Sequence, residues 1–473
     1  MKQAVAVLAA GLVLLAQPAR AAVTFDFIFD EAFPISVSSD GSVITGTLGS
    51  GGFPAFRWTQ ATGVVSLGRV QTGGGGGVPA ISADGTRIAY SIGSLDSSYR
   101  TQGLWTLGSG WQELMPPAPP DGGTVDGSYG SVWSLSGDGQ TVVGLYWRLG
   151  VGNRAHASKW TQATGVVDLG GTTTGQASRA NGVNFDGSVI AGWVETPTGP
   201  WRPAAWVGGS LVLLTDYIEA TIAGNGEAKA VTPSGDVIVG FAKDPVSGIR
   251  AATKWTRTGG VFGPSQVLGW VDGTSSTGNN IPFGVSADGG VVVGYCTFDG
   301  DPFSTTGFIW TAETGVQDIN EFLADHGVLV DPNFAIRSLT AITPDGTQIF
   351  GDGRMLTPPF TRKGFRITVP NLVAVAPDAP AARLELSAPS PNPSSSTSRL
   401  AFTLVTASNA DLSIFDAGGR RVATLLHADL QPGRRSVTWD GREAGGSRAA
   451  AGLYFARLTT EHGTVSRRLV RLR

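Results

Sequence analysis

The chain has 473 residues, of which 68 are Gly, 41% are hydrophobic and 15% are charged. This apolar content excludes intrinsic disorder, and the high Gly content favours many short strands joined by tight turns. Residues 381–473 contain 13 Arg and 7 acidic residues, a net charge of +6, whereas the rest of the chain has 21 basic and 30 acidic residues, a net charge of −9. An acidic main part argues against nucleic-acid binding.

The N-terminal residues 1–21 have the pattern of a secretory signal peptide. Lys2 precedes an apolar segment at residues 4–16, and Ala19 and Ala21 suit a small-residue cleavage site. The apolar segment is shorter than the ~20 residues that a transmembrane helix needs, and we expect no membrane span elsewhere. The expected location is therefore extracellular or on the outer-membrane surface.

One six-residue motif recurs seven times along the next part of the chain. Each copy has a small residue, an aliphatic residue, Ser, Thr or Asn, any residue, and then Asp-Gly, with Ser-Gly in the fifth copy. Asp-Gly is a hairpin-turn signal, because Gly tolerates positive φ and Asp can cap its own turn. The motif glycines, separated by 44, 54, 48, 48, 54 and 57 residues, are Gly41, Gly85, Gly139, Gly187, Gly235, Gly289 and Gly346.

Each motif is followed by three more strand patterns. The second strand ends in Gly46, Gly144, Gly192, Gly240, Gly294 and Gly351, with Tyr90 as the exception. The third strand carries Trp58, Trp105, Trp160, Trp206, Trp255 and Trp310. Four strands per unit of about 50 residues are typical of a propeller blade, so residues 22–370 predict a seven-bladed β-propeller. We expect the small residue of each motif to crowd the central axis and the Trp to pack between neighbouring blades.

The seventh unit has no fourth strand of its own after residues 365–368. Residues 23–29, ahead of the first motif, have a strand pattern and could supply it. We expect this strand to close the ring, because closure hides two sheet edges that would otherwise be unpaired.

The repeat resembles the HAF extracellular repeat of bacterial exported proteins over residues 30–368. The matching residues are the Ser-x-Asp-Gly-x-x-x-x-Gly stretches and the Ala-Phe-Arg-Trp-Thr segment at 55–59. Residues 319–324, followed by Gly327 and Val328, resemble the family's usual insertion before its last unit. The resemblance implies an extracytoplasmic setting, and since the family has no established activity, it implies no catalytic residue.

Residues 371–396 are rich in Pro and Ser and predict a linker. The strand patterns beyond it lie at 399–404, 411–416, 421–426, 435–439, 452–459 and 464–471. Strands at this spacing predict a small Ig-like β-sandwich over residues 397–473. Its positive charge is consistent with an ordinary solvated face or with an anionic surface partner.

Residues 387–473 resemble both the Ig-like domain of the flagellar hook-cap protein and the C-terminal sorting domain of type IX secretion cargo. The matching residues lie at 391–393, 412–422, 432–433, 438–442, 452–455 and 468–473. The resemblance implies recognition by an outer-membrane export machine, with cleavage or surface attachment afterwards. Ser394 and Ser395 stand where the family usually has Phe-Asn, so an active sorting signal and a structural module both remain open.

No sequence motif indicates catalysis or a cofactor. The four His residues are not at metal-ligand spacing, and there is no nucleophile elbow or P-loop. The one cysteine, Cys296, cannot form an internal disulfide and is expected to be a buried thiol. Asp299 and Asp301 could bind Ca²⁺, although a Ca²⁺ loop presents more oxygen ligands in series and a solvated turn fits better. The motif Asp residues lack the Thr-Trp ending of a sialidase Asp-box, so we expect them to cap turns.

The loops between the second and third strands, and those between blades, fall on one face of a propeller. In this chain these loops vary, while those on the other face are short and uniform. Variable loops on a rigid scaffold commonly carry binding residues, although unselected drift would give the same pattern. The candidate contacts on this face are Tyr99, Arg100, Trp147, Arg148, Trp201, Arg202 and Phe303.

Three functions follow as hypotheses. The first is a non-catalytic surface or secreted protein that binds a glycan, a protein or the cell envelope, with the export machinery as a further partner. The near-identical small residues on the inner strands favour it. The second is a hydrolase or lyase acting in the central funnel, which a cluster of acids with a His or Tyr there would favour. The third is a structural spacer, which uniformly polar loops would favour.

Overall fold

The structure is a computed structural model, and the chain divides into two compact units, Met1–Ala374 and Val375–Arg473. The proposed signal peptide at 1–21 and most of the expected linker lie outside the described residues. Within those residues, no helix combines the length and the apolar character needed to cross a membrane. The structure describes residues 22–472 except for 50–52, 69–75, 95–99, 117–129, 148–153, 174, 198–200, 216–225, 244–249, 270, 272–278, 299–300, 371–384, 387–388, 390–391, 393, 405–407, 431–432 and 462.

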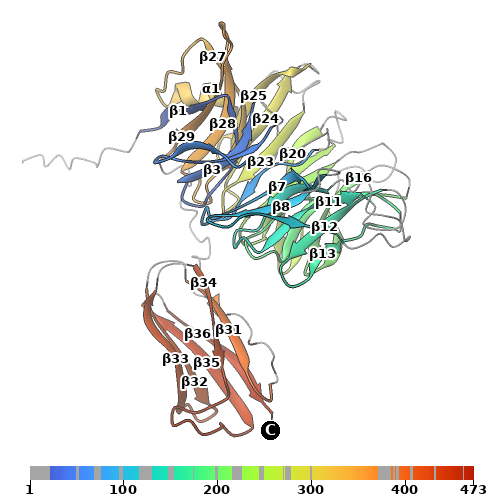
Figure 1. Ribbon diagram of the computed structural model, residues 1–473. Helices are drawn as coiled ribbons and strands as arrows, with labels where there is room; N and C mark the ends of the chain where they lie inside the picture. Colours follow the sequence, from blue (N-terminus) through green and yellow to red (C-terminus); the bar gives the residue numbers. More distant parts are fainter. Residues whose placement is uncertain are drawn as a thin grey trace, which may run out of the picture. The chain divides into compact units, whose positions relative to one another are not determined.

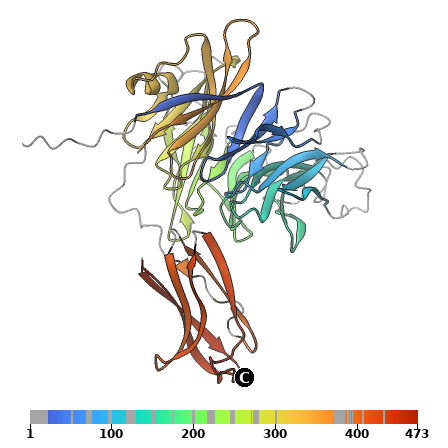
Figure 2. The same cartoon turned by 60° about the vertical axis from the view of Figure 1, so that its left-hand side comes forward.

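The described part of the first unit contains seven antiparallel sheets, which are the blades of a β-propeller (Figures 1 and 2). Blade one contains β2 (Ala32–Val37), β3 (Val43–Leu48), β4 (Ala55–Thr59) and β5 (Gly63–Ser66). Blade two contains β6 (Ala80–Ile81), β7 (Arg87–Gly93), β8 (Arg100–Thr106) and β9 (Gly110–Leu114). Blade three contains β10 (Gly130–Leu135), β11 (Thr141–Trp147), β12 (Ala155–Thr161) and β13 (Gly165–Asp168). Blade four contains β14 (Ser178–Val183), β15 (Val189–Glu195), β16 (Trp201–Val207) and β17 (Ser210–Leu213).

The remaining blades follow the same order from the inner strand outwards. Blade five contains β18 (Glu227–Val231), β19 (Val237–Lys243), β20 (Arg250–Thr258), β21 (Val261–Phe262) and β22 (Gln266–Gly269), the last two both pairing with β20. Blade six contains β23 (Asn280–Val285), β24 (Val291–Phe298), β25 (Asp301–Thr311) and β26 (Gly315–Asp318). Blade seven contains β27 (Phe334–Ile342), β28 (Gln348–Met355), β29 (Arg362–Thr368) and the N-terminal strand β1 (Thr24–Asp30).

The N-terminal strand closes the ring, as the sequence predicts. β1 pairs antiparallel with β29, from Thr24 opposite Thr368 to Asp30 opposite Lys363. In both views the blue N-terminal strand lies beside the orange strands of blade seven. Phe25 stacks on the buried Phe365 at 4.9 Å between ring centroids. Burial of such large aromatic surfaces is a major stabilising contribution to closure.

The repeated Asp residues cap the hairpin turns between the first and second strands. In blade two, Asp84 accepts hydrogen bonds from the Ser82 hydroxyl at 2.6 Å and the Thr86 N–H at 3.0 Å, while Gly85 adopts a φ of 69°. Burial by itself would raise the pKa of Asp84, but these hydrogen bonds lower it below its ordinary value. The same Asx turn recurs at Asp40, Asp138, Asp288 and Asp345. Turn capping is therefore confirmed.

The third-strand tryptophans pack between blades, as expected. The Trp206 indole N–H of blade four donates to the Leu169 carbonyl of blade three at 2.8 Å, and Trp255 of blade five donates to Thr215 of blade four at 2.9 Å. Both rings are almost fully buried. Cys296 is also fully buried, as expected, and burial raises the pKa of its thiol to about 12.

The expected insertion before the last unit contains the helix α1 (Ile319–Asp325), which lies between β26 and β27. Asp318 caps its N-terminus by accepting a hydrogen bond from the Asn320 N–H. Ile319, Phe322 and Leu323 are buried in the core of blades six and seven.

The second unit is a two-sheet β-sandwich. One sheet contains β30 (Glu385–Leu386), β31 (Ser398–Leu404) and β34 (Gly433–Trp439). The other contains β33 (Arg421–Leu430), β32 (Ser408–Asp416), β35 (Gly452–Thr460) and β36 (Gly463–Arg471). The six strands anticipated from the sequence are present. β30 falls within the segment expected to be linker, because the fully buried Leu386 adds an apolar side chain to the sandwich core.

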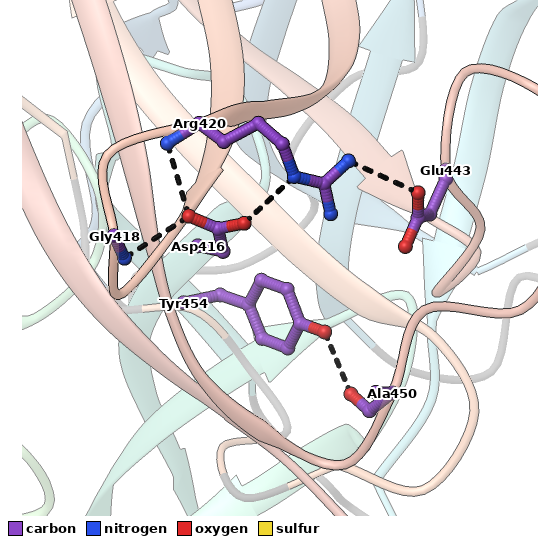
Figure 3. Close-up of polar contacts among 6 residues, drawn as sticks. All are labelled: Asp416, Gly418, Arg420, Glu443, Ala450 and Tyr454. Atoms are coloured by element: carbon purple, nitrogen blue, oxygen red, sulfur yellow. Dashed lines mark hydrogen bonds and ion pairs between the residues drawn. The ribbon is translucent and has the colours of Figure 1, made fainter.

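A polar cluster stabilises the β32–β33 hairpin on the surface of the sandwich (Figure 3). Asp416 accepts hydrogen bonds from the backbone N–H groups of Gly418 and Arg420 at 3.0 and 2.9 Å and from Arg420 Nε at 2.9 Å. The Arg420 backbone hydrogen bond is the main cause of the lowered pKa of Asp416. Arg420 also pairs with Glu443 at 3.3 Å, and the Tyr454 hydroxyl donates to the Ala450 carbonyl at 2.7 Å.

Candidate functional site

A cavity of about 360 Å³ lies at the centre of the propeller, and residues of all seven inner strands or their immediate approaches line it. Small-molecule sites usually have volumes of roughly 300–1,000 Å³. A second cavity of about 190 Å³ continues towards the Asp-Gly turns and shares Val183 and Val231 with the first. The first cavity, which we call the central cavity, is the candidate ligand site.

A β-bulge occurs at the same repeat position in six of the inner strands, counted over the described chain. In each, the register shifts at the residue just before the small residue of the motif. A bulge places two residues opposite one and redirects a side chain, and bulges are common beside active sites. The bulge residues, all of which line the central cavity, are Ile35, Trp133, Asn181, Lys229, Phe283 and Thr340.

The second-strand glycines of the repeat make these bulges possible. The prediction that the strand ends at this glycine is wrong, because each strand continues beyond it, as β19 does from Gly240 to Lys243. Each glycine pairs with the residue before a bulge, for example Gly240 opposite Ala228 in blade five. A Cβ at Gly240 would lie 2.0 Å from the carbonyl oxygen of Glu227, and a similar clash occurs with the inner strand at the other five glycines. In blade two, where Tyr90 replaces Gly, β6 has only two residues and no register shift. The bulge therefore explains both the repeated Gly and its exception.

The cavity lining is chemically divided. Around the ring, Trp133, Asn181, Lys229 and Phe283 occupy consecutive blades and provide aromatic rings, an amide and a cation. The opposite side has Thr340, Ile35 and Pro79, which are small or apolar. One half of the wall can thus form specific polar and aromatic contacts, while the other provides mainly shape.

A buried charged cluster supports the polar half. Arg179 Nη2 donates to Glu227 Oε2 at 2.6 Å, and Arg179 Nε donates to Asn181 Oδ1 at 2.7 Å. Asn181 Nδ2 donates to Ala228 O at 2.8 Å, so the amide orientation follows from its partners. Lys229 Nζ lies 3.6 Å from the same Glu227 oxygen, which is longer than a normal hydrogen bond.

Aromatic rings surround these cations. The Arg179 guanidinium lies 4.0 Å from the ring centroid of Trp133 and 5.4 Å from that of Trp193. Lys229 Nζ lies 5.4 Å from the Trp133 ring and 5.9 Å from the Phe283 ring. These are cation–π distances, and partial exclusion of water strengthens such contacts.

Burial lowers the pKa of both Lys229 and Arg179, and the nearby Glu227 carboxylate opposes that shift in each case. The side chains of Arg179, Lys229 and Glu227 are only 17%, 15% and 10% exposed. The cluster therefore combines two cations and one anion in a site with little water, where an unpaired charge is costly.

Backbone hydrogen bonds join neighbouring blades next to the Asp-Gly turns, around the second cavity. In each, the N–H of the first residue donates to the carbonyl of the second: Ser39 to Ala83, Ala83 to Gly137, Asp138 to Phe185, Phe185 to Pro233 and Ala287 to Pro344. The described chain has no such bond at the two joins where Pro233 and Pro344 hold the donor position, because Pro has no N–H. Adjacent inner strands are thereby held in register beneath the central cavity.

The predicted contact residues whose side chains the structure describes lie in three different blades. Arg100 is buried at 3% exposure in β8, although it was expected on a loop, because the strand begins there. Trp147 ends β11 and is 43% exposed, and Arg202 is half-buried in β16. Trp201 packs beside the charged cluster, since its ring lies 4.5 Å from that of Trp193, which in turn lies 5.4 Å from the Arg179 guanidinium. Tyr99 and Arg148 lie outside the described residues, and Phe303 is in β25 with its side chain undescribed.

The weak Ca²⁺ candidate cannot be assembled from the described residues. Asp299 lies outside them, and Asp301 begins β25 with its side chain undescribed. Across the described chain, no group of three or more His, Cys, Asp or Glu side chains is placed to hold a metal ion.

A His–Asp pair lies elsewhere in blade three. His156 Nδ1 and Asp168 Oδ2 are 2.9 Å apart, joining β12 to β13. In blade six the corresponding pair is Thr306 and Asp318, joined at 2.7 Å. Because the same two strand positions are bridged in another blade by a residue pair without His, the contact is explained as a strand-to-strand support.

The second unit matches a known family over residues 391–463, namely the FlgD Ig-like domain. No curated protein matches the chain. Among solved structures, the β-propeller domain of the Trilobed protease from Pyrococcus furiosus is 12% identical, with 72% of this chain and 95% of that chain covered and a TM-score of 0.45.

Oligogalacturonate lyase from Vibrio parahaemolyticus is 13% identical, with 75% of this chain and 99% of that chain covered and a TM-score of 0.44. TolB from Acinetobacter baumannii is 15% identical, with 50% of this chain and 56% of that chain covered and a TM-score of 0.34. The chain thus spans little more than half the length of the TolB protein that it matches.

Proposed function

We propose that this chain is an exported, non-catalytic binding protein that holds a small ligand in the central cavity. The observation that carries the proposal is the ring of six bulges, which presents a different side chain from each of six blades to the central cavity. A packed axis needs only small residues, whereas Trp133, Asn181, Lys229 and Phe283 form a wall suited to recognition.

The catalytic alternative needs several acids with a His or Tyr near the cavity. In the described cluster, Glu227 is the one carboxylate, and it already accepts hydrogen bonds from Arg179 and Asn181. A carboxylate held by two donors is poorly suited to act as a general base. This arrangement supports binding over hydrolysis or lyase chemistry.

The test is a binding screen on the mature chain, using thermal shift and then isothermal titration calorimetry with neutral and acidic sugars, amino acids and short peptides. Trp133→Ala should abolish binding, while Trp147→Ala on the loop face should leave it intact. Binding that survives Trp133→Ala and is lost in Trp147→Ala would move the site to the variable loops and refute the proposal. Circular dichroism checks that both variants fold.

For the second unit, we propose that residues 397–473 direct export and surface delivery as a sorting domain. The resemblance of its hairpin and terminal strands to type IX cargo domains supports this role, and the HAF-like repeat supports an extracytoplasmic setting. Deleting residues 387–473 should retain the protein inside producing cells, measured by fractionation. Unchanged export of the truncated chain would contradict the sorting role, while N-terminal sequencing of the mature protein tests cleavage after residue 21.

A further inference from the structure

We infer that the ligand of the central cavity is an acidic sugar, with one hexuronate carboxylate bound by Lys229. This inference rests on the proposed binding function and names its ligand class. It follows from the charge balance of the cluster, from the rings beside Lys229 and from the apolar wall opposite.

The charge balance requires one anion. Glu227 Oε2 accepts hydrogen bonds from Arg179 at 2.6 Å and from Asn181 at 3.3 Å. The hydrogen bonds of this oxygen therefore come mainly from groups other than Lys229. The Glu227 carboxylate raises the pKa of Lys229, and the Arg179 guanidinium lowers it. With Lys229 protonated, two cations face one carboxylate and the cluster has one positive charge in excess, and a bound monoanion would balance that charge and favour the protonated form that burial disfavours.

The geometry favours a carboxylate over a phosphate. The second cation, Arg179, is committed to Glu227 and Asn181 and is stacked on Trp133 at 4.0 Å. A dianionic phosphate would need further charge-assisted donors, as in the bidentate Arg sites that usually bind it. The single ammonium of Lys229 matches the single charge of a carboxylate.

The neighbouring rings favour a sugar. Trp133 is the bulge residue of blade three and Phe283 that of blade six, the blades that flank blades four and five. Both rings line the cavity, and their centroids lie within 6 Å of Lys229 Nζ. Phe283 stacks on Tyr295 at 5.4 Å between ring centroids, remains 36% exposed and lines the cavity. The C–H groups on one face of a pyranose pack well on such rings, while Ile35 and Pro79 offer apolar contact on the opposite wall.

The experiment compares glucuronic and galacturonic acid, as monosaccharides and disaccharides, with their methyl esters, the neutral sugars and glucose 6-phosphate. We expect the acids to bind the full mature chain about tenfold or more tightly than their esters, by calorimetry, as for a charge-assisted contact. Raising the salt concentration should weaken the binding of the acids and leave the binding of the neutral sugars unchanged.

Lys229→Met should reduce acid binding to the level of the ester, while Lys229→Arg should retain the preference for acids. The matched control is Lys363→Met, which removes a Lys from the outer ion pair with Asp30 and should change nothing. Lys229→Met leaves the Arg179–Glu227 pair intact, so it is expected to fold, and its melting temperature verifies this.

Each contrary outcome is distinct. Equal binding of acid and ester, or tighter binding of the phosphate, overturns the carboxylate assignment. Binding of amino acids or peptides in place of sugars, lost in Trp133→Ala, overturns the sugar class and leaves the proposed function standing. Absence of any ligand whose binding depends on Trp133 refutes the proposed function itself.

Discussion

The two units contain the same kind of ion pair in opposite settings. In the propeller, Arg179 and Glu227 approach to 2.6 Å with side chains 17% and 10% exposed. In the sandwich, Arg420 and Asp416 approach to 2.9 Å with side chains 62% and 26% exposed (Figure 3). Water and salt screen the second pair but hardly reach the first.

This difference decides what each pair can do. The Arg420–Asp416 pair orders a hairpin turn, and its residual charges are solvated at no cost. Lys229 shares the Glu227 carboxylate with Arg179, at 3.6 Å, and its side chain is only 15% exposed, so water compensates its charge poorly. Burial thus turns an ordinary surface contact into a candidate recognition site.

The largest expected effect on stability tests whether the propeller and the sandwich unfold independently. Phe365→Ala should lower the free energy of unfolding by about 3–5 kcal/mol, because it opens a cavity where β1 meets β29. Tryptophan fluorescence during urea unfolding reports mainly on the propeller, since Trp439 is the only Trp after residue 375. Leu469→Ala, in the sandwich core, should leave that transition in place. A common shift in both variants would show that the units unfold as one.

The next effect compares the two ion pairs directly. Glu227→Gln leaves Arg179 and Lys229 buried without a counter-charge and should cost on the order of 3 kcal/mol. Arg420→Gln removes an exposed partner and should not measurably change the melting temperature. Similar losses in both variants, measured by calorimetry, would contradict the contrast drawn between the two settings.

A smaller effect concerns the bulges. Gly240→Ala should destabilise the propeller by about 1–3 kcal/mol, because the new Cβ would press on the Glu227 carbonyl. Gly452→Ala in the sandwich is the matched control, since nothing lies within 4 Å of its Cβ position. If Gly240→Ala is as stable as the wild type, the explanation of the repeated Gly is wrong. Hydrogen exchange of blade five would locate the change.

The smallest effect depends on pH. Burial raises the pKa of Asp352, which accepts a hydrogen bond from Ser338, so its charged form is disfavoured in the folded state. The stability associated with its protonated form is present below the ordinary Asp pKa of 3.8 and is lost as the pH rises through the folded value. Asp352→Asn should therefore be more stable than the wild type at pH 7 and equal to it at pH 3. An equal gain at both pH values would exclude this explanation.

The blade count, the turns and the ring closure could all be predicted from the sequence, because each follows from a local repeated pattern. The capping residues around Asp84 and the interblade Trp206 are examples. The sandwich strands were predictable for the same reason, since alternation and turn residues are local signals.

The central cavity could not be predicted by alternation alone. A bulge shifts the register, so counting alternate residues assigns Lys229 or Trp133 to the wrong face. The available signal was the variation at one position beside an otherwise uniform motif. Arg179 and Glu227 also lie 48 residues apart, equal to the local repeat spacing, which places them at equivalent positions in adjacent blades.

The ring closure delays the pairing of the first strand during synthesis. Asp26 of β1 and its partner Arg366 of β29 are 340 residues apart in the chain. At roughly 5–20 residues per second, the first strand leaves the ribosome roughly 20–70 s before its partner exists. Through that interval the growing propeller has two open edges, which are the usual starting points of aggregation. The first strand of this protein must therefore be kept from other partners for longer than any other strand of the propeller.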